Sequence, residues 1–210
     1  MTVIVAIDGP AGAGKSSVAR ALAARLGFRY LDTGAMYRAL AWLALERGIA
    51  LDDEEALEAL ARAHPVTFGD GQSVSVDGRD VTTAIREPRI DAAVPVVARH
   101  PAVREVMRER QRALGEQGDS VIEGRDIGVV VTPHAELKVW LVADPAVRIA
   151  RRHAERDGIE HTELASELRR RDERDAANTH RALDAVEVDT TSDTLEQVVD
   201  RIAALVEERR

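Results

Sequence analysis

Cysteine is absent from this chain of 210 residues, which excludes disulfide bonds and thiolate metal sites and fits a reducing compartment. No apolar run is long enough to span a bilayer, and an apolar strand starts at residue 3, so we expect neither a membrane span nor a signal peptide. The net charge of −8 argues against nucleic-acid binding but leaves room for a local basic pocket that binds a small anion. With 45% apolar and 31% charged residues, we expect a globular cytoplasmic protein, with no nucleic-acid or membrane partner.

Lysine is also scarce, and one of the two lysines stands where its charge has a clear use. Residues 9–16 match the pattern G-x-x-x-x-G-K-[ST] and follow the apolar run 3–7 directly. Such a glycine-rich backbone turns consecutive N–H groups inward around an anion, and the next helix points its positive end at the same place. Lys15 adds a positive charge, and the Ser16 hydroxyl suits a magnesium ion bound through the nucleotide. We expect nucleotide phosphates to be bound by Gly9, Pro10, Ala11, Gly12, Ala13, Gly14, Lys15, Ser16 and Ser17.

Short apolar runs alternate with helical patterns along the chain. We expect strands at 3–7, 28–32, 120–122, 137–142 and 187–189. We expect helices at 15–26, 89–99 and 101–114, and a helix from a capping Thr33 to Gly48. A further helix begins at the acids at 52–55, another covers 145–175 with a break near Gly158, and the last begins at Thr194. This alternation predicts an α/β fold with a parallel sheet covered by helices on both faces.

Residues 65–83 have a different character. Apolar and polar residues alternate at 66–68, 73–76 and Val81, and Asp-Gly pairs separate these runs at 69–71 and 77–78. The pattern predicts a small antiparallel insert in the α/β chain.

Two further stretches carry candidate binding residues. In 32–38, the spacing lets Thr33, Tyr37 and Arg38 face one pocket, where Arg38 could hold a phosphate; the alternative is a capping threonine, a partly buried tyrosine and a solvated arginine. In 123–126, a glycine leads out of a buried strand and places Arg125 and Asp126 at the carboxyl edge of the sheet. The alternative is that Arg125 and Asp126 form a surface ion pair of little energetic value. Their place at the carboxyl edge of the sheet, where ligands bind, favours a role in binding.

The charged run at 171–175 is less informative by itself. Arg171 and Asp175 share a helix face at i,i+4, but runs of this kind are usually solvated helix surface. The same interpretation applies to Arg148, Arg151 and Arg152.

Taken together, the sequences at 7–15 (IDGPAGAGK), 31–38 (LDTGAMYR), 123–128 (EGRDIG) and 171–175 (RDERD) resemble those of the bacterial cytidylate kinases, which are P-loop nucleoside monophosphate kinases. The residues at 80–82, 85–86 and 101–104 resemble them too, so the likeness runs from Val3 to the C-terminal helix. It implies transfer of the γ-phosphoryl group of ATP to CMP or dCMP with magnesium, in pyrimidine nucleotide metabolism. It also implies one kinase domain over 1–210, with a core at about 1–60, 84–150 and 179–210, an acceptor-binding insert at about 61–83 and a helical lid at about 151–178.

The resemblance implies roles for single residues as well. Arg38 and Arg125 would hold the acceptor phosphate, and Thr33 and Tyr37 would line its pocket. Arg104 and Asp126 would meet the cytosine edge, because an Asp accepts from the amino group while an Arg donates to the ring acceptors. Arg171 and Asp175 would contact the sugar and phosphates from the lid. The catalytic side chains would then be those of Lys15, Arg38, Arg125 and Arg171. The partners would be the small-molecule substrates CMP and dCMP, and we expect the protein to be a monomer.

The sequence departs from the family pattern at two places. Pro95 stands where the family usually has a serine, so one base contact is missing and the helix around it could be kinked. Asn178 stands where a lid arginine is usual, and Arg181 is a candidate substitute. A GTPase is excluded because the only asparagine is followed by threonine, so no guanine-reading N-K-x-D exists. Two alternatives stay open: a non-catalytic nucleotide-binding regulator, and a kinase of another small acceptor.

Overall fold

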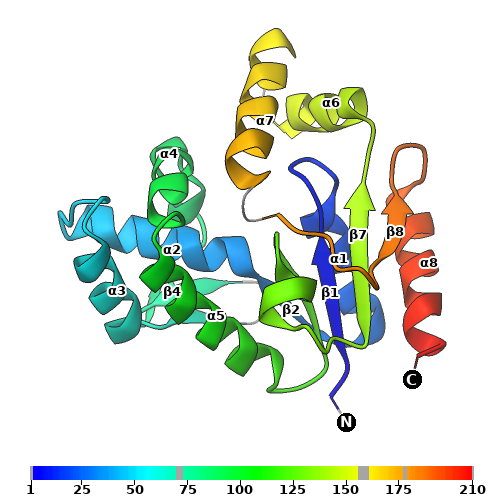
Figure 1. The fold of residues 1–210 in the computed structure, drawn as a ribbon, viewed down its shortest axis with the longest axis horizontal. Helices are drawn as coiled ribbons and strands as arrows, with labels where there is room; N and C mark the ends of the chain where they lie inside the picture. The colour runs from blue at the N-terminus through cyan, green and yellow to red at the C-terminus, as the bar shows by residue number, and fades with distance from the viewer. Residues whose placement is uncertain (1, 70–72, 156–160, 177–178, 210) are drawn as a thin grey trace. The chain divides into compact units, whose positions relative to one another are not determined.

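The computed structural model describes residues 2–69, 73–155, 161–176 and 179–209, which fall into two compact units (Figure 1). One unit comprises residues 1–30 and 115–210, and the other comprises residues 31–114. In the first unit the elements are β1 (Ile4–Asp8), α1 (Lys15–Leu26), β6 (Ser120–Glu123), the π-helix η3 (Ile127–Val131), β7 (Leu137–Val142), α6 (Pro145–Glu155), α7 (His161–Asp175), β8 (Val186–Asp189) and α8 (Leu195–Glu207). β2 (Arg29–Asp32) crosses the boundary between the units.

The first unit is built on a five-stranded sheet in the order β2-β6-β1-β7-β8. β1 lies at its centre and pairs in parallel with β6, where Ile7 is opposite Glu123, and with β7, where Asp8 is opposite Trp140. Apolar residues of the strands pack with α1 and α8, which lie side by side, to form a core that contains Ile7, Leu22, Leu141 and Ile202. Because the strands run in parallel, β1 and β6 deliver the residues that follow them to the same edge of the sheet.

The second unit is mostly helical and carries a small three-stranded antiparallel sheet. Its elements are α2 (Thr33–Glu46), α3 (Glu54–Ala63), β3 (Val66–Phe68), β4 (Val74–Val76), β5 (Arg79–Asp80), the 3₁₀ turn η2 (Ala84–Arg86), α4 (Pro88–Val97) and most of α5 (Pro101–Gly115). α2 is buried along most of its length and packs against α3, α4 and the small sheet.

The predicted architecture is confirmed: a parallel sheet flanked by helices, together with a small antiparallel insert. The two-residue turn predicted at 77–78 is present, since Asp77 and Gly78 both have positive φ (52° and 72°) and join β4 to β5 in a hairpin. The turn signal at 70–71 and the helix break near Gly158 lie outside the described residues.

Several details differ from the expectations. Thr33 does not cap its helix: the carboxylate of Asp32 accepts from the Ala35 N–H at 2.9 Å, and Thr33 is the first helical residue. Val81 follows β5 and does not belong to it, although its N–H still donates to Val74. α4 begins at Pro88 and ends at Val97, two residues before the predicted end, and Pro95 lies inside its last turn without interrupting it. The π-helix η3 was not predicted.

Candidate active site

The loop at residues 9–14 leaves β1 through a backbone that only glycine can adopt. Gly9 has a φ of 149°, and a Cβ built on it would lie 2.3 Å from the carbonyl oxygen of Leu141 in β7. Gly12 and Gly14 also have positive φ, and Gly14 ends the loop as the N-cap of α1. The first turn of α1 therefore opens at the loop, where its unpaired N–H groups favour an anion.

The cations predicted for phosphate binding contact this loop. The Lys15 ammonium donates to the carbonyl oxygens of Gly9 and Pro10, both at 2.8 Å. The Arg125 guanidinium, which follows β6, donates to the Gly9 carbonyl at 2.9 Å. The structure thus brings Lys15 and Arg125 together at one backbone carbonyl, although they are far apart in the sequence.

Glu123 is a buried carboxylate at the end of β6 whose two oxygens face different partners. The Ser16 hydroxyl donates to Oε2 at 3.0 Å, and the Tyr30 hydroxyl on β2 donates to Oε1. Glu123 is only 4% exposed, so its carboxylate is held by these contacts and not by solvent. No role was predicted for Glu123 from the sequence, although it opens the stretch at 123–126. The signal in the sequence was an acidic residue directly after the apolar residues 121 and 122, which places a carboxylate at the carboxyl edge of the sheet.

Asp8, the last residue of β1, shapes the turn that carries Arg125 and Asp126. Its carboxylate accepts from the backbone N–H groups of Ile127 and Gly128 at 2.9 and 2.8 Å. Burial raises the pKa of Asp8 to about 6, despite these two hydrogen bonds, and the nearby Asp126 carboxylate acts in the same direction. Asp126 itself is 8% exposed, and its backbone carbonyl accepts from Val130 as η3 begins. The surface ion pair considered for Arg125 and Asp126 is therefore wrong for Asp126, which is buried.

Two arginines of α6 and one acid of α7 also hold the loop, Arg151 through Thr190, so the prediction of solvated helix surface is wrong for Arg148, Arg151 and Asp172. Arg148 donates to the Ala11 carbonyl at 2.9 Å and to the Asp172 carboxylate at 2.7 Å, and Asp172 accepts from the Ala11 N–H at 3.3 Å. Arg151 donates to the Thr190 hydroxyl at 2.9 Å, and that hydroxyl donates to the Ala13 carbonyl at 3.2 Å. In sequence these charges look like solvated helix surface, so no local signal separates them from their neighbours.

The candidates of the second unit lie on two helices. Thr33 and Tyr37 belong to α2, where Thr33 is buried and Tyr37 packs against the core. Arg38, next on α2, donates to the Ile85 carbonyl at 3.1 Å and forms an ion pair with Asp91 of α4. Its side chain is 16% exposed, so the alternative of a solvated arginine is wrong. Arg104 lies in the first turns of α5 and is partly buried.

The predicted lid residues are described only in part. Arg171 and Asp175 belong to α7, but their side chains lie outside the described residues, as does Asn178. Arg181, the candidate substitute for a lid arginine, forms an exposed ion pair with Glu187 of β8. No helix within the described ranges combines the length and apolar character needed to cross a bilayer.

A parallel sheet with β1 at its centre, and a lysine-bearing glycine loop between that strand and a helix, define a P-loop kinase fold. The shikimate kinase of Bacteroides thetaiotaomicron has this fold, with a TM-score of 0.50 at 18% identity over 99% of both chains. The family profile described as cytidylate kinase matches residues 5–208. The cytidylate kinase of Geobacillus sp. (strain WCH70) is 49% identical over 98% of this chain and 96% of its own length, and that of Geobacillus kaustophilus is 48% identical over 99% and 97%. The chain belongs to the cytidylate kinase family, whose members are nucleoside monophosphate kinases.

Proposed function

We propose that this protein transfers the γ-phosphoryl group of ATP to CMP or dCMP and releases ADP with CDP or dCDP. The observation that carries the proposal is the near-complete match to the cytidylate kinases, at almost half of all positions, together with the geometry of the lysine-bearing loop. Sequence identity with the cytidylate kinases extends over both units, which supports the same reaction in this protein. Similarity of the fold alone would not support it.

The donor phosphates would bind at residues 9–17. The N–H groups at the start of α1 and the Lys15 ammonium supply positive charge there. Groups of this kind, fixed in place, stabilise the negative charge on the phosphate oxygens during phosphoryl transfer. Lys15 would exchange its carbonyl contacts for phosphate oxygens, which is favourable because the partner then carries full negative charge.

The magnesium ion would be held by the nucleotide phosphates, by Ser16 and by Glu123. The donor set fits: a hydroxyl and a carboxylate are the oxygen ligands that Mg²⁺ takes, and it usually needs only one or two carboxylates beside substrate phosphates. When bound, the ion supplies charge neutralisation on the transferring group.

The acceptor would be bound by two groups of residues. Arg38 and Arg125 would hold its phosphate, since the planar guanidinium fork matches phosphate oxygens with paired N–H donors. Thr33 and Tyr37 would line the pocket, and Arg104 and Asp126 would read the cytosine edge. The burial of Asp126 supports this last role, because a buried carboxylate discriminates strongly when its partner amino group is missing.

The reaction needs no general base from the protein. The acceptor phosphate is already a nucleophile, so the residues named here position it and stabilise charge. The insert at about 61–83 would enlarge the acceptor region, and the segment at about 151–178, with Arg171 and Asp175, would act as the lid. We also propose a monomer, which light scattering after size-exclusion chromatography tests.

An acceptor panel tests the proposed function. ADP formation is measured with Mg-ATP and, separately, CMP, dCMP, UMP and AMP. We expect turnover with CMP or dCMP that exceeds turnover with AMP at least about a hundredfold in kcat/KM, because the wrong base leaves buried polar groups unpaired. Comparable turnover of AMP would assign the protein to another acceptor, and ATP binding without turnover of any of the four would identify a non-catalytic nucleotide-binding protein.

A further inference from the structure

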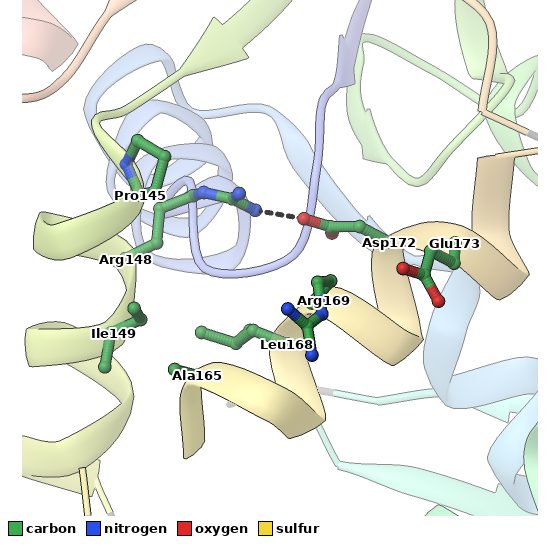
Figure 2. A pocket seen from close by; sticks show the side chains of 8 residues that line it. All are labelled: Pro145, Arg148, Ile149, Ala165, Leu168, Arg169, Asp172 and Glu173. Atoms are coloured by element: carbon green, nitrogen blue, oxygen red, sulfur yellow. Dashed lines mark hydrogen bonds and ion pairs between the residues drawn. The ribbon is translucent and has the colours of Figure 1, made fainter. Parts of the chain in front are cut away.

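One side chain of α6 and one of α7 hold both backbone groups of a single residue in the phosphate loop. The Ala11 N–H donates to Oδ1 of Asp172 at 3.3 Å, and the Ala11 carbonyl accepts from Arg148 at 2.9 Å. The same nitrogen of Arg148 donates to Oδ2 of Asp172 at 2.7 Å. Figure 2 shows this ion pair, with Arg148 on α6 and Asp172 on α7 pointing toward each other beside the loop. The three residues form a closed set of contacts, which we call the Ala11 clasp.

The clasp is partly shielded from solvent and closely packed. The side chains of Arg148 and Asp172 are 14% and 30% exposed. The backbone of the loop approaches α6 closely, because a Cβ built on Gly12 would lie 3.1 Å from the Cβ of Arg148. The Nε atom of Arg148 is buried without a hydrogen-bond partner among the described residues, so its guanidinium is not fully satisfied by the clasp. A contact of this kind is stronger than an exposed surface ion pair.

The chemistry of the clasp conflicts with phosphate binding at the same loop. A glycine-rich loop binds phosphate with consecutive backbone N–H groups, and Ala11 lies in the middle of that run. Asp172 places a carboxylate on one of these N–H groups, where it acts as an anion in the manner of a phosphate oxygen. A phosphate oxygen bound to the same N–H would lie against this carboxylate, and two anions in contact repel each other.

We propose that Asp172 is a resident anion of the donor site, which Arg148 holds on Ala11 and which the phosphates of ATP must displace. The inference rests on the proposed function, since it takes residues 9–17 as the donor site. Two arrangements then compete: one with Asp172 on Ala11 and one with phosphate there. The apparent affinity for ATP is lowered by the fraction of molecules in the first arrangement.

The clasp also links donor binding to the lid. Asp172 lies on α7, the helix that carries Arg171 and Asp175, for which we propose acceptor contacts. Displacement of Asp172 by ATP releases this helix from the loop. Donor binding thereby frees the helix that serves the acceptor, and favours the order ATP first.

The test compares Asp172→Asn with Glu173→Gln on the full chain. Glu173 is the next residue of α7, and its replacement removes the same charge from an exposed side chain that forms no hydrogen bond to the loop within the described part of the chain. Binding of ATP, and separately of pyrophosphate, is measured by titration calorimetry without an acceptor. We expect Asp172→Asn to bind both ligands about tenfold more tightly, the lower end of what a charged hydrogen bond contributes, and Glu173→Gln to stay within about twofold of the unchanged protein.

Each other outcome overturns the inference. Unchanged or weaker binding by Asp172→Asn would mean that the clasp does not compete with phosphate, and an equal gain in Glu173→Gln would mean that only net charge matters. Asp172→Ser is measured in parallel, so that a folding defect of one variant, seen by circular dichroism, does not decide the result. Lys15→Ala separates this inference from the proposed function: if it binds ATP as well as the unchanged protein, the donor site itself is wrong, whereas a large loss keeps the donor site and leaves the clasp to be judged by Asp172 alone.

Discussion

Asp8 offers a quantitative test, because its buried carboxylate links stability to pH in an unusual direction. In the folded protein its pKa is raised from 3.8 to about 6, chiefly by burial at the end of β1. A raised carboxyl pKa means that the folded state binds the proton more tightly than the unfolded state, so this group stabilises the fold below about pH 4. That contribution is lost as the pH rises from the unfolded pKa through the folded one.

The size of the effect follows from the shift. A shift of about two units corresponds to about 3 kcal/mol, of which about 2 kcal/mol falls between about pH 4.5 and pH 7.5. Other carboxylates act in the opposite direction, for example Asp184, whose pKa is lowered by the hydrogen bond from Lys138. The quantity to measure is therefore the difference between the unchanged protein and Asp8→Asn, in which all other groups cancel.

Urea unfolding of the two proteins is measured at several values across that pH range. Asn cannot ionise, and it keeps one acceptor for the N–H groups of Ile127 and Gly128, as a protonated Asp does. We expect the free energy of unfolding of the unchanged protein, relative to Asp8→Asn, to fall by about 2 kcal/mol from about pH 4.5 to about pH 7.5. A difference that is constant within about 0.5 kcal/mol, or that rises with pH, would refute the reasoning about burial.

Four further variants test separate parts of the site. Lys15→Ala should lower kcat more than about a thousandfold while the circular dichroism spectrum stays unchanged, since the charge acts on the transferring phosphoryl group; a loss below about tenfold would remove Lys15 from the reaction. Glu123→Gln should raise the Mg²⁺ concentration for half-maximal binding of ATP at least about tenfold in titrations, and an unchanged Mg²⁺ dependence would contradict its role beside Ser16. Asp126→Asn should reduce the preference for CMP over UMP in kcat/KM at least about tenfold and leave the Kd for ATP within about twofold; if selectivity survives, another group reads the base. Gly9→Ala should destabilise the fold by about 2–4 kcal/mol in urea unfolding, because its Cβ would lie 2.3 Å from the Leu141 carbonyl oxygen. A loss under about 0.5 kcal/mol would show that the backbone at Gly9 and β7 can shift to relieve this contact.

The sequence predicted the parts of the site that depend on the local chain. The loop and its lysine follow from glycine conformations and from the strand before them, and Arg125 follows from its place after a buried strand. The hairpin at Asp77 and Gly78 was equally visible, since two positive φ angles require such residues. Helix and strand positions were right where periodicity was strong, as for 15–26 and 137–142.

The rest depends on contacts between distant segments, which no local pattern records. Arg148 and Asp172 look like ordinary solvated charges until α6 and α7 place them on Ala11. Tyr30 and Ser16 meet on Glu123 only because β2 and β1 both neighbour β6. The capping residue was mistaken between Asp32 and Thr33 because both side chains cap helices well, and only the backbone direction after β2 decides between them.

The most direct test of the central claim follows the labelled phosphoryl group itself. The protein is mixed with Mg²⁺, CMP and ATP that carries radioactive phosphorus in the γ position, and the products are separated by thin-layer chromatography. The account predicts that the label appears in CDP, one for each ADP formed, and that Lys15→Ala gives almost none. Label that appears only as inorganic phosphate, or an equal yield from Lys15→Ala, would contradict it.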